Sequence, residues 1–249
     1  MYADLGRGVF ELLWLAGATK EKRHDAVGAY VSFDGATLVT LDAALARGPV
    51  LFAVAHTGNW ELLAYAAARM LKARGRRLAV VAKPIAVSGI HAFCTRLREA
   101  MGLVLLSPRG ALAASNQVLE DGDVVAMPID QVPDKRSHGT PAAFLGAEAL
   151  CDRAPAVLAR HTRATILVIG GTRAGGCQHI AILREIRPEP RKADFAVRAT
   201  LEATRALEVH VHETPESWLW LHRRWRDPRE QAPNVSRLSR REVPANSAA

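Results

Sequence analysis

Short apolar runs alternate with longer segments of helical periodicity through the middle of the chain. Residues 50–55 form an apolar run typical of a buried strand, and residues 60–71 carry apolar side chains at helical spacing. The same patterns predict further strands at 78–82, 103–106, 124–129, 165–172 and 179–186. They predict further helices at 88–101, 108–121, 152–163 and 192–212. Gly102 and Gly122 follow two of these helices, where glycine commonly ends a helix.

This alternation predicts an α/β fold with a largely parallel central sheet flanked by helices on both faces. The strands at 165–172 and 179–186 follow each other directly and are candidates for pairing with each other. Ligands in open sheets of this kind bind beyond the carboxyl ends of the strands. That rule points to residues that come just after predicted strands, namely His56, Lys83, Ser107 and Asp130.

The two ends of the chain differ from this regular middle. Residues 1–17 carry apolar side chains at helical spacing and predict an amphipathic helix, which either lies on a membrane or covers one edge of the core. Residues 227–249 are polar and basic, contain prolines and lack periodicity, so we expect a disordered tail. Residues 1–226 have a length suited to a single domain.

Composition narrows the classes of partner. The 249-residue chain carries a net charge of +8, which favours anionic partners such as lipid headgroups, an acidic carrier protein or nucleic acid. The three cysteines are scattered without CxxC spacing, so we expect neither a disulfide framework nor a zinc knuckle, as is usual in a reducing cytoplasm. No stretch reaches the roughly 18–20 apolar residues of a transmembrane helix, so we expect no membrane span.

Candidate chemistry is concentrated where the first predicted strand passes into its helix. Asn59 is a good N-cap, which places Glu61 in the first helical turn, where the helix dipole favours an ionised carboxylate. Glu61 can then accept a hydrogen bond from one nitrogen of His56 and leave the other nitrogen basic, as in acyl transfer. Gly58 permits a sharp turn, and the N–H groups of this turn are candidates for anion or oxyanion contacts. A capping glutamate beside an incidental histidine has the same spacing and remains an alternative.

Several stretches together resemble the bacterial lipid A biosynthesis acyltransferase family, the late lauroyl and myristoyl transferases. Residues 55–61 look like its H-x4-D/E signature, and residues 215–225 are close to its C-terminal signature. Weaker similarities occur, in the family's order, at 83–84, 97–102, 130–131 and 143–146. The resemblance covers residues 5–226 and implies the fold of the glycerolipid acyltransferases.

The resemblance implies transfer of a fatty acyl group from an acyl carrier protein or coenzyme A thioester to a hydroxyl of a membrane glycolipid, a lipid A precursor or a related lipid. His56 is then the general base, and Glu61 orients and charges its imidazole. A thioester is already activated, so neither a metal nor another cofactor is implied. The expected location is peripheral, on the anionic cytoplasmic face of the bacterial inner membrane.

Further residues are expected to contact substrate or membrane. Arg98, with Arg96 nearby, is a candidate contact for a phosphate or for developing negative charge, because guanidinium offers a bidentate fork. Lys83 stands where the family usually has arginine and keeps only the charge. The other candidates, for the acceptor, the active-site wall or anionic lipid, are Gly58, Asn59, Asp130, Gln131, His222, Arg223 and Arg224. Solvated arginines on a helix face and an ordinary turn after a strand remain alternatives for these positions.

Three other classes of function compete with acyl transfer. A metal-dependent hydrolase built on His56, Glu61, Asp130 and either His138 or His222 lacks any paired-histidine motif. A nucleic-acid-binding module is disfavoured because the aromatic residues are few and are not interleaved with basic ones, so no nucleic-acid partner is expected. A non-catalytic membrane-surface protein of the same fold, which only binds lipid, is the remaining alternative.

Overall fold

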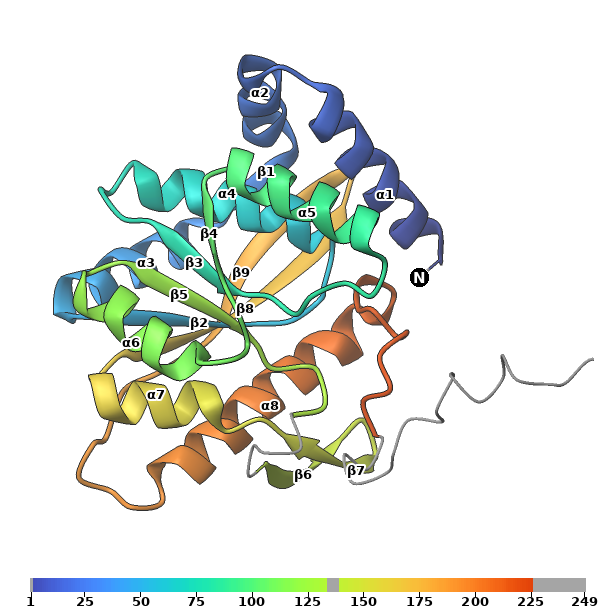
Figure 1. The fold of residues 1–249 in the computed structure, drawn as a ribbon. Coiled ribbons are helices and arrows are strands. Elements are labelled where there is room, and N and C mark those ends of the chain that lie inside the picture. The colour runs from blue at the N-terminus through green and yellow to red at the C-terminus, as the bar shows by residue number, and fades with distance from the viewer. Residues whose placement is uncertain (1, 134–138, 226–249) are drawn as a thin grey trace, which may run out of the picture.

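A seven-stranded sheet lies at the centre of the computed structural model, which describes residues 2–133 and 139–225 (Figure 1). The strands are β1 (Val31–Phe33), β2 (Val50–Val54), β3 (Leu78–Val81), β4 (Leu103–Leu106), β5 (Val124–Pro128), β8 (Thr165–Ala174) and β9 (Cys177–Ile186). Their order across the sheet is β1-β9-β8-β2-β5-β3-β4. All neighbouring strands are parallel except β8 and β9, which form an antiparallel pair. The predicted largely parallel α/β sheet is therefore confirmed.

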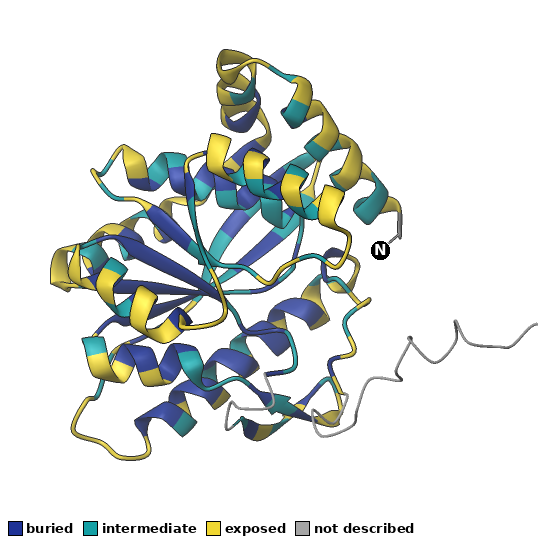
Figure 2. Ribbon diagram, in the orientation of Figure 1, coloured by how far each residue is buried: buried dark blue, intermediate teal, exposed yellow. Residues whose placement is uncertain are grey.

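Helices cover both faces of this sheet. They are α1 (Tyr2–Gly17), α2 (Lys20–Tyr30), α3 (Gly35–Arg47), α4 (Trp60–Lys72), α5 (Ser88–Ala100), α6 (Ala111–Glu120), α7 (Ala154–Thr162) and α8 (Phe195–Glu213). One hydrophobic core joins α6, α7 and α8 to one face of the sheet, and a second joins α3 and α4 to the opposite face. A third cluster packs α1, α2 and α5 against α4. Figure 2 shows the buried strands between these partly exposed helices.

Three parts of this fold were not predicted from the sequence. Helix α2 has no apolar stripe in its sequence, and Ala26 and Val27 are its only buried residues. Strand β1 and helix α3 follow it, and β1 has three residues held in place by pairing with β9. A separate antiparallel hairpin, β6 (Thr140–Phe144) and β7 (Ala147–Cys151), lies outside the main sheet.

The helices predicted at 108–121, 152–163 and 192–212 all begin two or three residues later than expected, as α6, α7 and α8.

Helix α1 covers an edge of the core, one of the two roles predicted for it, and also carries exposed apolar side chains. Leu15 is buried in the third core cluster, so the helix does cover the edge of the core. Its other side exposes Val9, Phe10, Leu13 and Trp14, with Phe10 75% exposed. No helix in the described part of the chain is long and apolar enough to cross a membrane. The predicted tail at 227–249 lies outside the described residues.

Candidate functional site

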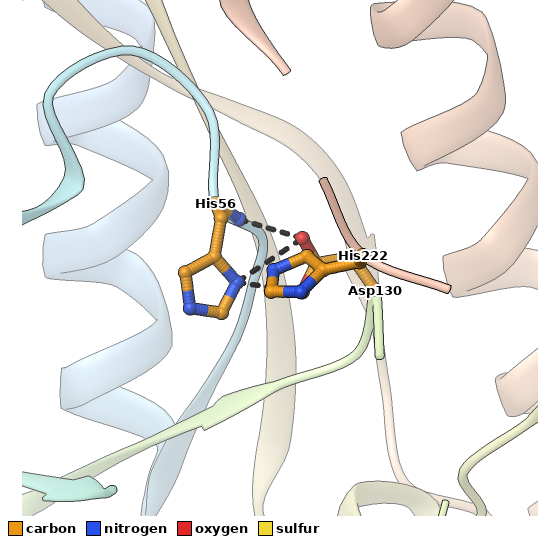
Figure 3. Close-up of side chains that lie close together, drawn as sticks. All are labelled: His56, Asp130 and His222. Carbon is orange, nitrogen blue, oxygen red and sulfur yellow. Dashed lines mark hydrogen bonds and ion pairs between the residues drawn. The ribbon is translucent and has the colours of Figure 1, made fainter. Parts of the chain in front are cut away.

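The sheet order brings His56 and Asp130 together at the carboxyl edge. Strands β2 and β5 are parallel neighbours, so the residues that follow them leave the sheet side by side. His56 Nδ1 lies 3.0 Å from Asp130 Oδ1, and the His56 backbone N–H donates to Oδ2 at 2.8 Å (Figure 3). The indole N–H of Trp218 also donates to Oδ2, at 3.1 Å. These bonds hold the carboxylate in one orientation against the histidine ring.

The environment of Asp130 determines how His56 can act. Burial by itself would raise the pKa of this fully buried carboxyl, but attraction to His56 and hydrogen bonds from its ring and backbone outweigh that effect. The pKa of Asp130 therefore lies below its ordinary value, and the group is a carboxylate that can only accept hydrogen bonds. Nδ1 of neutral His56 must then carry the hydrogen, which leaves Nε2 as a base. The pair is a base with its orienting group.

Glu61 has a different partner from the one predicted. It lies in the first turn of α4, as expected, but its carboxylate accepts hydrogen bonds from Nε and Nη2 of Arg98 on α5, with Nε at 2.9 Å. Among the described residues, Asp130 and not Glu61 receives the hydrogen bond from His56 Nδ1. The predicted His56–Glu61 hydrogen bond is therefore wrong. The same ion pair occupies the fork of Arg98 that was expected to meet a phosphate.

The turn after β2 is held by its own amides. The N–H groups of residues 57–59 donate to acceptors within the protein: Thr57 to the Ala55 carbonyl at 2.9 Å, Gly58 to the Ser217 carbonyl at 2.8 Å, and Asn59 to Gln178 Oε1 at 3.1 Å. An oxyanion contact from this turn would require one of these bonds to break. The turn amides are thus structural in this conformation, contrary to expectation.

Gly58 and Asn59 support the turn and do not face a substrate. Gly58 has φ +58°, and a Cβ at this position would lie 2.7 Å from Gln178 Oε1. Asn59 is buried, and its Oδ1 accepts the Leu62 N–H to cap α4. Its Nδ2 donates to Glu11 of α1 at 2.6 Å. The predicted N-cap is confirmed, while substrate contact by the Asn59 side chain or at the Gly58 Cα is not compatible with this packing.

His222 completes a cluster with the pair. Its ring meets the His56 ring edge to face, with centroids 4.8 Å apart, and its buried Nε2 has no partner among the described residues. Burial, and then repulsion from His56 and Lys83, lower the pKa of His222, although Asp130 opposes them. One ligand atom from each of His56, Asp130 and His222 lies within 4.8 Å of the others. The fold therefore assembles the minimum donor set for a metal, although hydrogen bonds already occupy the Asp130 carboxylate.

A cavity of about 1940 Å³ opens on His56. This exceeds the roughly 300–1,000 Å³ of sites for drug-sized ligands. Its apolar branch lies between α4 and the sheet and is lined by residues that include Phe52, Val54, Ala64, Ala67, Met70 and Val80. Its polar end is lined by Lys83, Ser107, Arg109, Asp152 and Arg153. The histidine thus stands where an apolar and a charged compartment meet.

The sequence profile of the bacterial lipid A biosynthesis acyltransferase family matches residues 1–227. The chain belongs to this family. The resemblance noted in the sequence is thereby confirmed, and membership in the lipid A acyltransferase family implies an acyltransferase. No curated protein sequence matches the chain closely enough to add a relative.

The C-terminal signature of this acyltransferase family member lies against the turn that carries His56. Leu219 N–H donates to the His56 carbonyl at 2.9 Å, and Thr57 forms an isolated antiparallel bridge with Trp218. Trp218 is buried between Phe144 and two other tryptophans. The resemblance to the family included this motif, but the linear sequence did not connect it with Asp130.

The remaining predicted site residues separate into two groups. Lys83 and Gln131 meet near the cavity, with Lys83 Nζ 3.0 Å from Gln131 Oε1, whereas Arg96 and Arg223 are exposed. Arg224 is only 1% exposed, so the expectation that it holds anionic lipid is wrong. Its guanidinium donates to the Leu150 carbonyl and lies over the Phe144 ring, 5.2 Å from the centroid. Arg224 therefore orders the wall beside the site, which was the other role considered for it.

Proposed function

We propose that this protein transfers a fatty acyl group from an acyl carrier protein or coenzyme A thioester to a hydroxyl of a membrane glycolipid, a lipid A precursor or a related lipid. The observation that carries the proposal is the His56–Asp130 pair at the opening of a lipid-sized cavity. His56 is 20% exposed at its side chain, so its ring can meet a substrate, while Asp130 is inaccessible behind it. His56 is the proposed general base, and Asp130 takes the orienting role first assigned to Glu61.

In the proposed step, Nε2 of His56 takes the proton from the acceptor hydroxyl as its oxygen attacks the thioester carbonyl carbon. The tetrahedral intermediate breaks its C–S bond, and the departing thiolate takes the proton back from His56. Asp130 offsets the positive charge that the imidazole carries between these two transfers. The products are an ester and a free thiol. Because the thioester is an activated donor, the step uses no metal ion or other cofactor.

Peripheral attachment to the cytoplasmic face of the bacterial inner membrane is part of the proposal. The exposed apolar side of α1 consists of Val9, Phe10, Leu13 and Trp14. These side chains suit insertion at a lipid interface, and the net charge of +8 favours an anionic surface. Leu12 of the same helix lines the cavity, so this attachment would bring the cavity near the lipid.

An acyl-transfer assay with His56→Ala tests the reaction class. Acyl-carrier-protein and coenzyme A thioesters with a labelled chain are incubated with total lipid extract, and label in lipid is measured. We expect transfer by wild type and by His161→Ala, an exposed histidine at the end of α7, and none above background by His56→Ala. The labelled product identifies the acceptor. Absence of transfer by wild type, with binding to lipid vesicles retained, would favour the non-catalytic lipid-binding alternative.

If the apolar branch of the cavity holds the acyl chain, shortening that branch should change the preferred length of the chain. Ala67→Phe would place a ring in the space between α4 and the sheet and shorten the branch. We expect a preference for donors with acyl chains several carbons shorter, measured as the ratio of kcat/KM for long and short thioesters. Because the ring enters existing space, the thermal unfolding midpoint should change little. Ala73→Phe, at the exposed end of α4, is the control and should keep the wild-type ratio; an unchanged ratio in Ala67→Phe would place the chain elsewhere.

A further inference from the structure

The polar end of the cavity gathers more positive charge than the proposed acyl-transfer step requires. Lys83 follows β3 and Arg109 follows the neighbouring strand β4, so both side chains belong to the same edge of the sheet. Arg153 directly precedes α7, which packs against α6. All three residues line the cavity that contains His56. Parallel strands and adjacent helices therefore bring three cations, widely separated in sequence, to one compartment.

Few negative charges oppose these cations. Among the described residues, four cationic side chains and two carboxylates, Glu61 and Asp152, line the cavity. Glu61 is paired with Arg98, and Asp152 Oδ1 accepts the Ala154 N–H at 2.9 Å. Lys83 binds the neutral Gln131 amide oxygen. The compartment is therefore net cationic within the part of the chain that the structure describes.

The backbone around these cations adds to the attraction for an anion. Helices α6 and α7 begin beside each other at this end of the sheet, as Figure 1 shows, and residues of both first turns line the cavity. Gly110, the N-cap residue of α6, has no side chain to accept from its helix, whereas at α7 the Asp152 carboxylate already accepts the Ala154 N–H. The positive end of the α6 dipole therefore faces the compartment without a capping side chain. Independently, the buried Nε of Arg153 has no hydrogen-bond partner among the described residues, so this N–H group is available to an anionic ligand.

We propose that Lys83, Arg109 and Arg153 form a binding site for a phosphate group of a substrate. Two guanidinium forks and an ammonium match the oxygens of a phosphate ester, and arginine binds such groups through two parallel hydrogen bonds. The inference rests on the proposed function in assigning the phosphate to a reactant of acyl transfer. Phosphate is shared by the phosphopantetheine of the donor and by a phosphorylated acceptor lipid, and the experiment distinguishes these sources.

Equilibrium binding tests the site without requiring turnover. Titration calorimetry with His56→Ala protein below the critical micelle concentration compares two matched pairs of probes: palmitoyl-4′-phosphopantetheine with palmitoyl-pantetheine, and lysophosphatidic acid with monoacylglycerol. We expect the phosphorylated member of at least one pair to bind about tenfold or more tightly, in a salt-sensitive manner. Arg109→Gln with Arg153→Gln should abolish that difference. Lys72→Gln with Arg191→Gln removes the same charge from positions that do not line the cavity and should preserve the difference.

Each outcome has a distinct meaning. Phosphate dependence in the pantetheine pair alone assigns the site to the donor, and dependence in the lipid pair alone assigns it to the acceptor. Equal binding within both pairs, or a phosphate preference that survives in the Arg109 and Arg153 double variant, would overturn the site. Phosphate-dependent binding by a wild-type protein that transfers no acyl group would instead defeat the proposed function and leave the site standing.

Discussion

Asp130→Asn is expected to lower kcat for acyl transfer by roughly 10²–10⁴-fold, the range in which general-base catalysis contributes. Asparagine keeps the size of the side chain but removes its charge. Its amide can present an N–H group to His56 Nδ1, which would favour the tautomer with the hydrogen on Nε2. That tautomer cannot accept the proton from the acceptor hydroxyl. The measurement is the steady-state rate of transfer of a labelled acyl chain at saturating donor and acceptor, at pH 7–8.

Glu61→Gln is the matched control, because it makes the same chemical change at the carboxylate first predicted to orient His56. It weakens the pair with Arg98 but leaves the His56–Asp130 contact in place. We therefore expect a clearly smaller loss of kcat than in Asp130→Asn. The reverse order of the two losses would return the orienting role to Glu61 and contradict the assignment to Asp130.

The pH range of this comparison follows from the direction of the Asp130 shift. Folding lowers the pKa of Asp130, so the folded protein binds this proton less readily than the unfolded chain does. The resulting stabilisation is complete above the ordinary carboxyl pKa and is lost as the pH falls through the lower folded value. At pH 7–8 this contribution is constant. A difference in rate there is not caused by titration of the carboxyl.

Arg224→Ala is expected to lower the free energy of unfolding by roughly 2–4 kcal/mol, through a cavity beside Phe144 and an unpaired Leu150 carbonyl. The free energy lost with the packing should exceed the free energy gained when a cation is no longer buried, because the aliphatic stem and the guanidinium of Arg224 are both enclosed. Urea denaturation measures this change. Binding to anionic vesicles, adjusted for the folded fraction, should be unchanged, since the side chain does not reach the surface.

Arg223→Ala, at the preceding residue, supplies the comparison. Arg223 is exposed, so its removal should change the free energy of unfolding by no more than about 0.5 kcal/mol. If this end of the chain approaches an anionic membrane, the same change should weaken vesicle binding in a salt-dependent way. A large loss of stability in Arg223→Ala together with a neutral Arg224→Ala would show that the packing of this segment has been assigned to the wrong residue.

Local sequence was sufficient for the elements whose signals are local. The strand predicted at 103–106 has those bounds in β4, and the helix predicted at 60–71 ends one residue later, at Lys72. Apolar periodicity and caps act over a few residues, so a linear pattern contains them. Helix α2 has an N-cap, Thr19, but no apolar stripe, and strand β1 has only three residues. Their positions depend on contacts with α4 and β9, which are distant in sequence.

The features of the site likewise separate into those set by local sequence and those set by tertiary contacts. By itself the sequence determined the family, the α/β class and the strand-end positions of His56 and Asp130. Only the tertiary structure decided which carboxylate meets the histidine, because that depends on β2 and β5 being neighbours in the sheet. Arg223 and Arg224 are likewise identical neighbours in the sequence, yet one is exposed and the other is enclosed by the β6–β7 hairpin. Partner choice and burial depend on contacts between residues that are far apart in the chain, and local pattern does not encode those contacts.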